Sequence, residues 1–178
     1  MSTVLAPEPV SFRGNDMDPV VRLARRAHGS ESLPALEHLL VNDLRVLVPH
    51  EHSALLLVAA GETKLAATGG ETSAGLESLR AVLPLFVQQE GIAVVTVDGP
   101  STGFDDDEAT TRIAEVLRGS GQRAMISVPL IHHGRTLAFL LMFYIHHPLP
   151  GPADLRPLAE LAPLLASALS REQLLASS

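Results

Sequence analysis

The stretch SVPLIHHGRT at residues 127–136, followed by the apolar run LAFLLMFYI at residues 137–145, decides the fold. Apolar residues on both sides of Gly134 predict two strands joined by a tight turn, because glycine readily adopts the backbone angles of such turns. A short loop rich in proline and glycine follows. Leucines then recur at three- and four-residue steps, which predicts a long helix over residues 155–176. We expect Asp154 to cap this helix and Pro163 to kink it.

The upstream chain can be divided in the same way. The expected elements are helices at 18–28 and 32–47, strands at 53–60 and 63–68, a helix at 76–89 that Pro84 disturbs, a strand at 92–97 and a helix at 110–117. Strands joined by hairpins near both ends favour an antiparallel sheet. The predicted fold class is therefore an α+β sandwich, with a central antiparallel sheet of five or six strands and helices on both faces.

Composition narrows the class of protein. A chain of 178 residues with 46% hydrophobic residues predicts a mobile tail at residues 1–15 and a single domain at residues 16–178. A net charge of −7 argues against nucleic acid as a partner. The run at residues 137–145 is shorter than the roughly 20 residues that span a bilayer, and no signal peptide is evident. Without cysteine the chain has no disulfide or thiolate chemistry, so we expect a cytoplasmic protein without a membrane partner.

Three segments of this chain resemble the GAF family of small α/β sensor modules. They are Ser-Val-Pro-Leu at residues 127–130, EGIAVVTVD at residues 90–98, and the helix at residues 33–52 that leads into the first strand. The resemblance covers residues 32–175. It implies an antiparallel sheet with the first and last helices on one face. On the other face, residues 75–90 and 100–122 would cover a ligand pocket.

The resemblance also implies a function and candidate ligand contacts. We expect a non-catalytic regulatory domain that senses a small molecule or binds a signalling protein such as a kinase or response regulator. The candidate contacts are Leu79, Leu83, Phe86, Phe104 and Ser127. The alternative is a dimerisation scaffold without a ligand, in which the same leucines and phenylalanines fill the pocket. Because the chain has no cysteine, a bilin attached through cysteine and the cysteine chemistry of some GAF enzymes are excluded, and we expect no cofactor.

Eight histidines raise the question of a metal or haem site. In a GAF sheet the first and last strands are antiparallel neighbours, which would bring His50 and His52 close to the doublet His146-His147. The doublet His132-His133 lies at the far end of its strand. Apart from Glu51 no carboxylate is available nearby to orient imidazole ligands. We therefore expect neither a metal site nor tight haem binding.

The last helix carries a wider apolar surface than one sheet contact requires. The leucines and alanine on it are Leu155, Leu158, Leu161, Leu164, Leu165, Ala168, Leu169, Leu174 and Leu175. We predict a homodimer through this helix and the helices that precede His50. Leu165→Glu and Leu169→Glu distinguish two outcomes, because they weaken the dimer if they face the partner and unfold the domain if they face the sheet.

Overall fold

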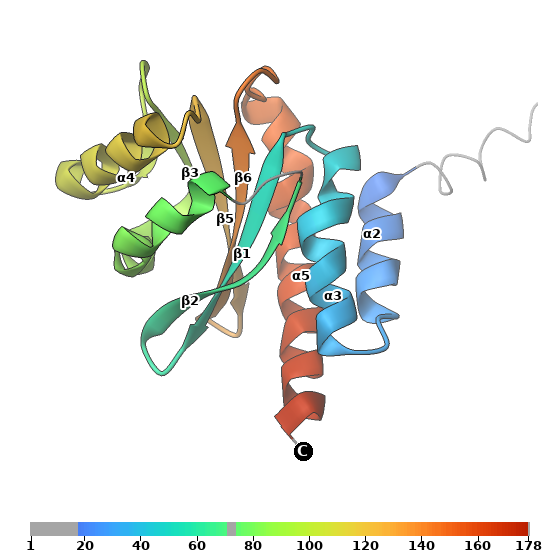
Figure 1. Ribbon diagram of the computed structural model, residues 1–178. Coiled ribbons are helices and arrows are strands. Elements are labelled where there is room, and N and C mark those ends of the chain that lie inside the picture. The colour runs from blue at the N-terminus through green and yellow to red at the C-terminus, as the bar shows by residue number, and fades with distance from the viewer. Residues whose placement is uncertain (1–17, 71–73, 178) are drawn as a thin grey trace, which may run out of the picture.

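The computed structural model describes residues 18–70 and 74–177, and the predicted tail lies outside these ranges (Figure 1). A six-stranded antiparallel sheet with the order β2-β1-β6-β5-β3-β4 forms the centre. Its strands are β1 (His52–Ala59), β2 (Glu62–Gly69), β3 (Gln89–Thr96), β4 (Thr102–Phe104), β5 (Ala124–His132) and β6 (Arg135–Tyr144). With helices on both faces, this is the predicted α+β architecture.

Local turn chemistry forms two of the strand pairs. Ala60 and Gly61 join β1 to β2, and His133 and Gly134 join β5 to β6. All four residues have positive φ, between 52° and 77°. Two consecutive residues of this kind make the turn whose twist matches that of paired strands. The predicted hairpin around Gly134 is therefore confirmed, and so is the earlier hairpin.

One helical layer covers β2, β1, β6 and β5. It consists of α2 (Pro19–His28), α3 (Leu33–Asn42), the short 3-10 helix η2 (Asp43–Val46) and α5 (Pro152–Ser177). Asp18 and Ser32 cap α2 and α3 through their side chains. The prediction that Asp154 caps α5 is wrong. Leu155 N–H already bonds to the Gly151 carbonyl, so the helix starts earlier, at a proline suited to the first turn.

The opposite face carries the 3-10 helices η3 (Ala74–Ala81) and η4 (Leu83–Gln88), and α4 (Asp107–Gly119). The single helix predicted at residues 76–89 is wrong, because the segment breaks at Val82. Pro84 lacks an N–H and disfavours helical angles in the residue before it. Asp106 caps α4 by accepting a hydrogen bond from Glu108 N–H. β4 was not predicted from the sequence, because it has only three residues.

Alternate residues of β6 build two separate cores. Ala138, Leu140, Met142 and Tyr144 face the α2, α3 and α5 layer and belong to the first core, whereas Phe139, Leu141 and Phe143 face η3, η4 and α4 and belong to the second core. The strand is buried on both faces, which explains its unbroken apolar run. In the described ranges, no helix is long and apolar enough to cross a membrane.

The sheet side of the first core is covered unevenly. Leu55, Val128, Leu140 and Met142 are at most 2% exposed. Leu57 and Val94 are only half-buried. Val94 lies on β3 and lines an open groove with the first turns of α5, because no helix covers that part of the sheet. The difference in burial between these residues depends on which part of the sheet the helices cover, and the strand pattern alone does not predict that coverage.

Candidate functional site

The space in which the GAF resemblance places a ligand lies between the sheet and η3, η4 and α4. Leu79, Leu83 and Phe86 pack into it and are 1%, 8% and 0% exposed. The Phe86 ring occupies its centre, 6.0 Å from the ring of Phe104 and 5.9 Å from that of Phe139 (centroid distances). Three of the five candidate contacts are thus core side chains that touch one another.

Ser127 is fully buried on β5, and its hydroxyl is used inside the sheet. Its Oγ donates to Oε1 of Gln89 at 2.6 Å, and Nε2 of Gln89 donates to the Ser127 carbonyl at 2.7 Å. The same Nε2 donates to the Gly91 carbonyl at 2.8 Å. This network joins β3 to β5 at Gln89, where the register of the pairing between β3 and β4 shifts. Gln89 cannot be recognised from the sequence, because an isolated glutamine belongs to no pattern.

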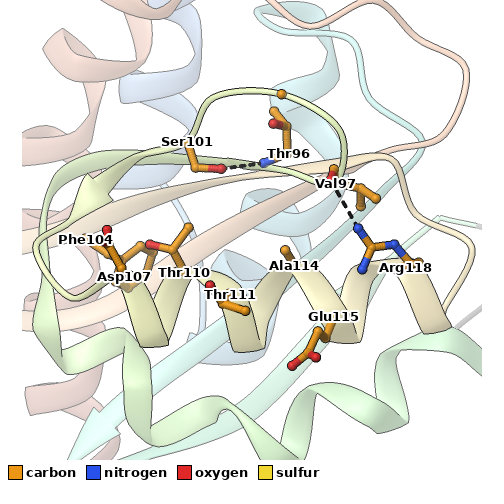
Figure 2. Close-up of a pocket in the computed structure, with 11 residues that line it drawn as sticks. Thr96, Val97, Ser101, Phe104, Asp107, Thr110, Thr111, Ala114, Glu115 and Arg118 are labelled. Carbon is orange, nitrogen blue, oxygen red and sulfur yellow. Dashed lines mark hydrogen bonds between the residues drawn. The ribbon is translucent and has the colours of Figure 1, made fainter.

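Phe104 is the candidate residue that borders an open groove beside α4 (Figure 2). The groove has a volume of about 450 Å³. Its lining is Thr96, Val97, Gly99, Ser101, Phe104, Asp107, Thr110, Thr111, Ala114, Glu115 and Arg118. Four of its polar side chains already have partners. Ser101 Oγ accepts from Thr96 N–H at 3.0 Å, and Arg118 donates to the Val97 carbonyl at 3.3 Å. The hydroxyls of Thr96 and Thr110 donate to the carbonyls of Pro100 and Asp106. Hydroxyls, carboxylates and a guanidinium therefore mix here in contact with solvent.

At the edge of the sheet where β1 begins and β6 ends, the predicted residues are neighbours, but a carboxylate rather than a set of histidines organises them. Because β1 and β6 are antiparallel, Glu51 lies beside the residues that leave β6. Its carboxylate accepts hydrogen bonds from the N–H groups of Ile145, His146 and His147 at 2.9, 2.5 and 3.0 Å. From the other side, Arg123 donates to the carbonyls of Ile145 and His147. We call this arrangement of Glu51 and Arg123 around residues 145–147 the loop clamp.

The surroundings of this edge favour the neutral form of His50 and the ionised form of Glu51. Burial is the main cause that lowers the pKa of His50 to about 4, and its Nδ1 lies 2.7 Å from the Val48 carbonyl. Partial burial acts to raise the pKa of Glu51, but the three N–H groups and His147 outweigh it and lower the pKa below 4.5. Burial, with Glu51 nearby, raises the pKa of Tyr144. Within residues 18–70 and 74–177, no group of three or more His, Asp or Glu is placed to hold a metal ion.

The leucines chosen to test the dimer do not face a partner. Leu165 and Leu169 are 1% and 0% exposed and belong to the core under α5. The exposed leucines of the helix are instead Leu164, Leu174 and Leu175, at 41%, 69% and 61%. The predicted homodimer remains a prediction, but its contact residues on α5 have to be these.

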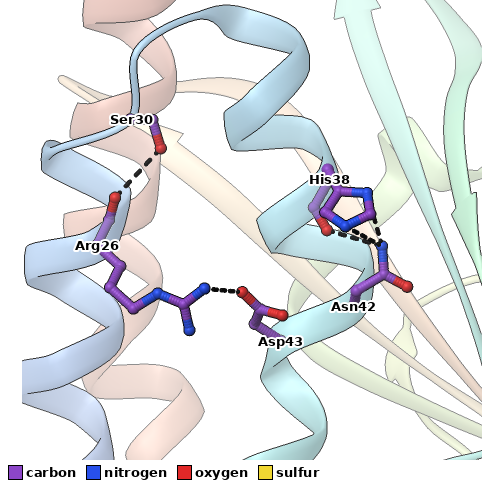
Figure 3. Close-up of polar contacts among 5 residues, drawn as sticks. All are labelled: Arg26, Ser30, His38, Asn42 and Asp43. Atoms are coloured by element: carbon purple, nitrogen blue, oxygen red, sulfur yellow. Dashed lines mark hydrogen bonds and ion pairs between the residues drawn. The ribbon is translucent and has the colours of Figure 1, made fainter.

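Surface polar contacts join the outer helices of the same layer (Figure 3). Arg26 of α2 forms an ion pair with Asp43 at 2.5 Å. Within α3, the Asn42 side chain donates to the His38 carbonyl at 3.0 Å. The Arg26 side chain is 60% exposed, so this pair contributes little to stability. The contacts position the helices and provide no chemistry.

No protein-family model matches the sequence, and no curated protein matches it. Several solved structures are nevertheless similar in fold. A bacteriophytochrome from R. palustris aligns with a TM-score of 0.63 and 12% identity over 94% of this chain and 39% of that one. The chain thus spans about two fifths of that protein's length.

Two single domains align over nearly their whole length. The phycoerythrobilin-bound GAF domain of a cyanobacterial phytochrome gives a TM-score of 0.64 at 13% identity, over 91% of this chain and 98% of that one. A domain described as part of a two-component sensor histidine kinase from Sinorhizobium meliloti 1021 gives 0.61 at 18% identity, over 81% and 94%. This chain therefore has a GAF-like fold.

Proposed function

We propose that this chain is a non-catalytic regulatory GAF-type domain that acts through protein contacts, first with a second copy of itself, and holds no ligand in the GAF ligand space. The observation that carries the proposal is the filled second core, with Phe86 at its centre between Phe104 and Phe139. A small-molecule site typically needs an enclosed space of about 300–1,000 Å³, whereas here the Phe86 ring fills the centre of the space. A ligand in this space would first have to displace a fully buried phenyl ring, which costs about 1.5–3 kcal/mol in lost burial.

The chemistry of the sequence supports the same proposal. The similar cyanobacterial domain holds phycoerythrobilin, whereas this chain has no cysteine to attach a bilin covalently. The absence of cysteine also fits a reducing compartment, and we place the protein in the cytoplasm. A signalling protein such as a kinase or response regulator is the further partner class that we propose, in view of the likeness to a sensor histidine kinase domain.

The surface of α5 supports a second copy as the first partner. This helix of 26 residues is about 39 Å long, and its C-terminal end extends past the sheet (Figure 1). Leu164, Ser167, Arg171 and Leu174 follow one another at steps of three, four and three residues, and two of them are exposed leucines. That spacing places the four residues on one stripe of the helix, with an exposed leucine at each end that a partner can cover. Burying the leucines in a partner removes apolar surface from water.

Native mass spectrometry and sedimentation velocity of the full chain test both halves of the proposal. We expect a dimer at tens of micromolar protein and no retained small molecule. The double variant Leu164→Glu/Leu174→Glu should be monomeric with an unchanged circular dichroism spectrum. Val87→Glu is the matched control, because Val87 is 54% exposed but lies on η4, across the sheet.

Two results would contradict the proposal. A monomeric unaltered protein at these concentrations would exclude the dimer. A small molecule retained at a one-to-one ratio, and lost in a variant that alters the second core, would show that the GAF ligand space is functional.

The groove beside α4 favours a second candidate function, the sensing of a small polar molecule. It combines an exposed guanidinium, Arg118, with an exposed carboxylate, Glu115, one helical turn apart. Such a pair suits a ligand with charges of both signs. Titration with free amino acids, with Arg118→Gln as the comparison, distinguishes this candidate, because the scaffold predicts no saturable response.

A further inference from the structure

We propose a second binding site, for a small neutral ring-containing molecule, in a cleft on the face of the sheet opposite the GAF ligand space. The cleft has a volume of about 740 Å³ and lies where the chain enters β1, leaves β6 and starts α5. Its lining is Leu47, Val48, Pro49, His147, Pro148, Leu149, Pro150, Ala153, Asp154 and Pro157. Size and lining both fall within the range of small-molecule sites, which are mostly apolar with few polar groups.

The walls of the cleft determine the class of ligand. Four of its ten lining residues are prolines, and Leu47, Val48 and Leu149 add aliphatic surface. A proline ring has a fixed φ, no N–H and almost no side-chain entropy to lose on binding. A wall of this kind presents flat apolar surface at low entropic cost. It fits an aromatic or alicyclic ring better than a flexible chain.

The loop clamp holds this wall in place. Glu51 binds the three N–H groups of residues 145–147, and Arg123 binds two of their carbonyls. The chain passes directly from this clamp into the cleft wall at His147 and Pro148. The wall is therefore anchored by five side-chain hydrogen bonds immediately before it begins. A pre-formed wall lowers the ordering cost that a ligand must otherwise overcome.

The scarcity of polar groups in the cleft argues for a neutral ligand. Eight of its ten lining residues are apolar, and the only polar side chains among them are His147 and Asp154. Asp154 already accepts a hydrogen bond from Gly151 N–H at 3.3 Å.

Behind the wall, His50 bonds to the Val48 carbonyl, and its ring lies 6.4 Å from that of Tyr144. Among the described residues, the buried Tyr144 hydroxyl has no hydrogen-bond partner.

The site does not depend on the proposed dimer, but it can act on it. Ala153 and Pro157 belong to α5, the helix whose later turns carry Leu164 and Leu174. A ligand that packs against the first turns of α5 therefore contacts the helix that carries these leucines. The cleft therefore offers a way to regulate the protein contacts from the face that the GAF ligand space does not use.

Titration of the full ¹⁵N-labelled chain with indole, followed by amide chemical shifts, tests the proposal. We expect saturable shifts at the amides of residues 47–48, 147, 149 and 153–154, with a dissociation constant of about 1 mM or tighter. Ala153→Phe should weaken binding at least tenfold, because the ring fills the cleft. Ala159→Phe is the matched control, since Ala159 is also exposed on α5 but lines the adjacent groove.

Three outcomes would overturn the inference. They are the absence of saturable shifts, an equal loss of binding in both alanine variants, and binding of benzoate or benzylamine as tight as that of indole. Shifts centred on Phe86 instead would place the ligand in the GAF ligand space and contradict the proposed function as well. Because the oligomeric state is measured separately, failure of the cleft and failure of the dimer can be told apart.

Discussion

Removal of the Glu51 carboxylate should destabilise the fold through the loop clamp. Glu51→Ala leaves three N–H groups of residues 145–147 without their acceptor. A buried hydrogen bond to a charged group contributes about 1.5–3 kcal/mol. Glu51 is only half-buried, so water replaces part of each lost bond. We therefore expect a total loss of about 2–3 kcal/mol at pH 7, or a fall in Tm of about 5–10 °C for a chain of this size.

Glu51→Gln separates the charge from the shape of the side chain. Its carbonyl oxygen can replace Oε2, which accepts from His146 and His147, but its NH₂ then opposes the N–H of Ile145. We expect a loss of about 1–2 kcal/mol at pH 7. Urea denaturation followed by circular dichroism measures both variants. Glu62→Gln, on an exposed glutamate of β2, is the control and should be neutral.

The pH dependence provides the decisive result. The pKa of Glu51 in the folded state is lowered below its ordinary value of 4.5. Its contribution is therefore fully present above about pH 4.5 and is lost as the pH falls through the folded-state pKa. The stability difference between wild type and Glu51→Gln should narrow in that acid range. If the difference is the same at pH 7 and at pH 3, or is below about 0.5 kcal/mol at pH 7, the reasoning is refuted.

Three further substitutions test the packing. Phe86→Ala should cost about 3–5 kcal/mol in urea denaturation, since the ring is fully buried, and a loss below 1 kcal/mol would contradict a filled ligand space. Gly103→Ala should cost about 2 kcal/mol or more in thermal denaturation, because φ is +102° and the new Cβ would lie 2.4 Å from the Cα of Ala93; an unchanged Tm would contradict the close approach. Leu165→Glu should abolish the cooperative unfolding transition, because it buries an unpaired charge, whereas a folded monomer would place Leu165 at the dimer contact.

Elements specified by local chemistry were predictable from the sequence. The hairpin around Gly134 needs positive φ at two adjacent residues, and a His-Gly pair supplies it. α4 begins at Asp106, Asp107 and Glu108 because the free N–H groups of a first helical turn attract carboxylates. β4 was missed because three residues carry no periodicity, and it forms only through pairing with β3.

The candidate site was harder to predict, since apolar residues that cover a ligand and those that replace one have the same sequence pattern. Leu79 and Phe86 fit either role, and only their burial against Phe139 distinguishes the two. The GAF resemblance placed residues 50–52 near residues 146–147, but the hydrogen bonds of the loop clamp were not predicted. Glu51 meets residues 145–147 only after β1 and β6 have paired. Long-range pairing brings these groups together, and a short window of sequence does not contain it.

The strand order has a consequence for how the chain is made. β1 and β2 are synthesised before the rest of the sheet, but the second neighbour of β1 is β6. Leu55 of β1 therefore has no partner on that side until Leu140 of β6 has been synthesised. At about 5–20 residues per second, this interval lasts roughly 4 to 17 seconds. During that time the inner edge of β1 exposes unpaired backbone groups and apolar side chains. We therefore expect slow folding dominated by non-local contacts, and nascent chains that depend on chaperones until the β5–β6 hairpin has been synthesised.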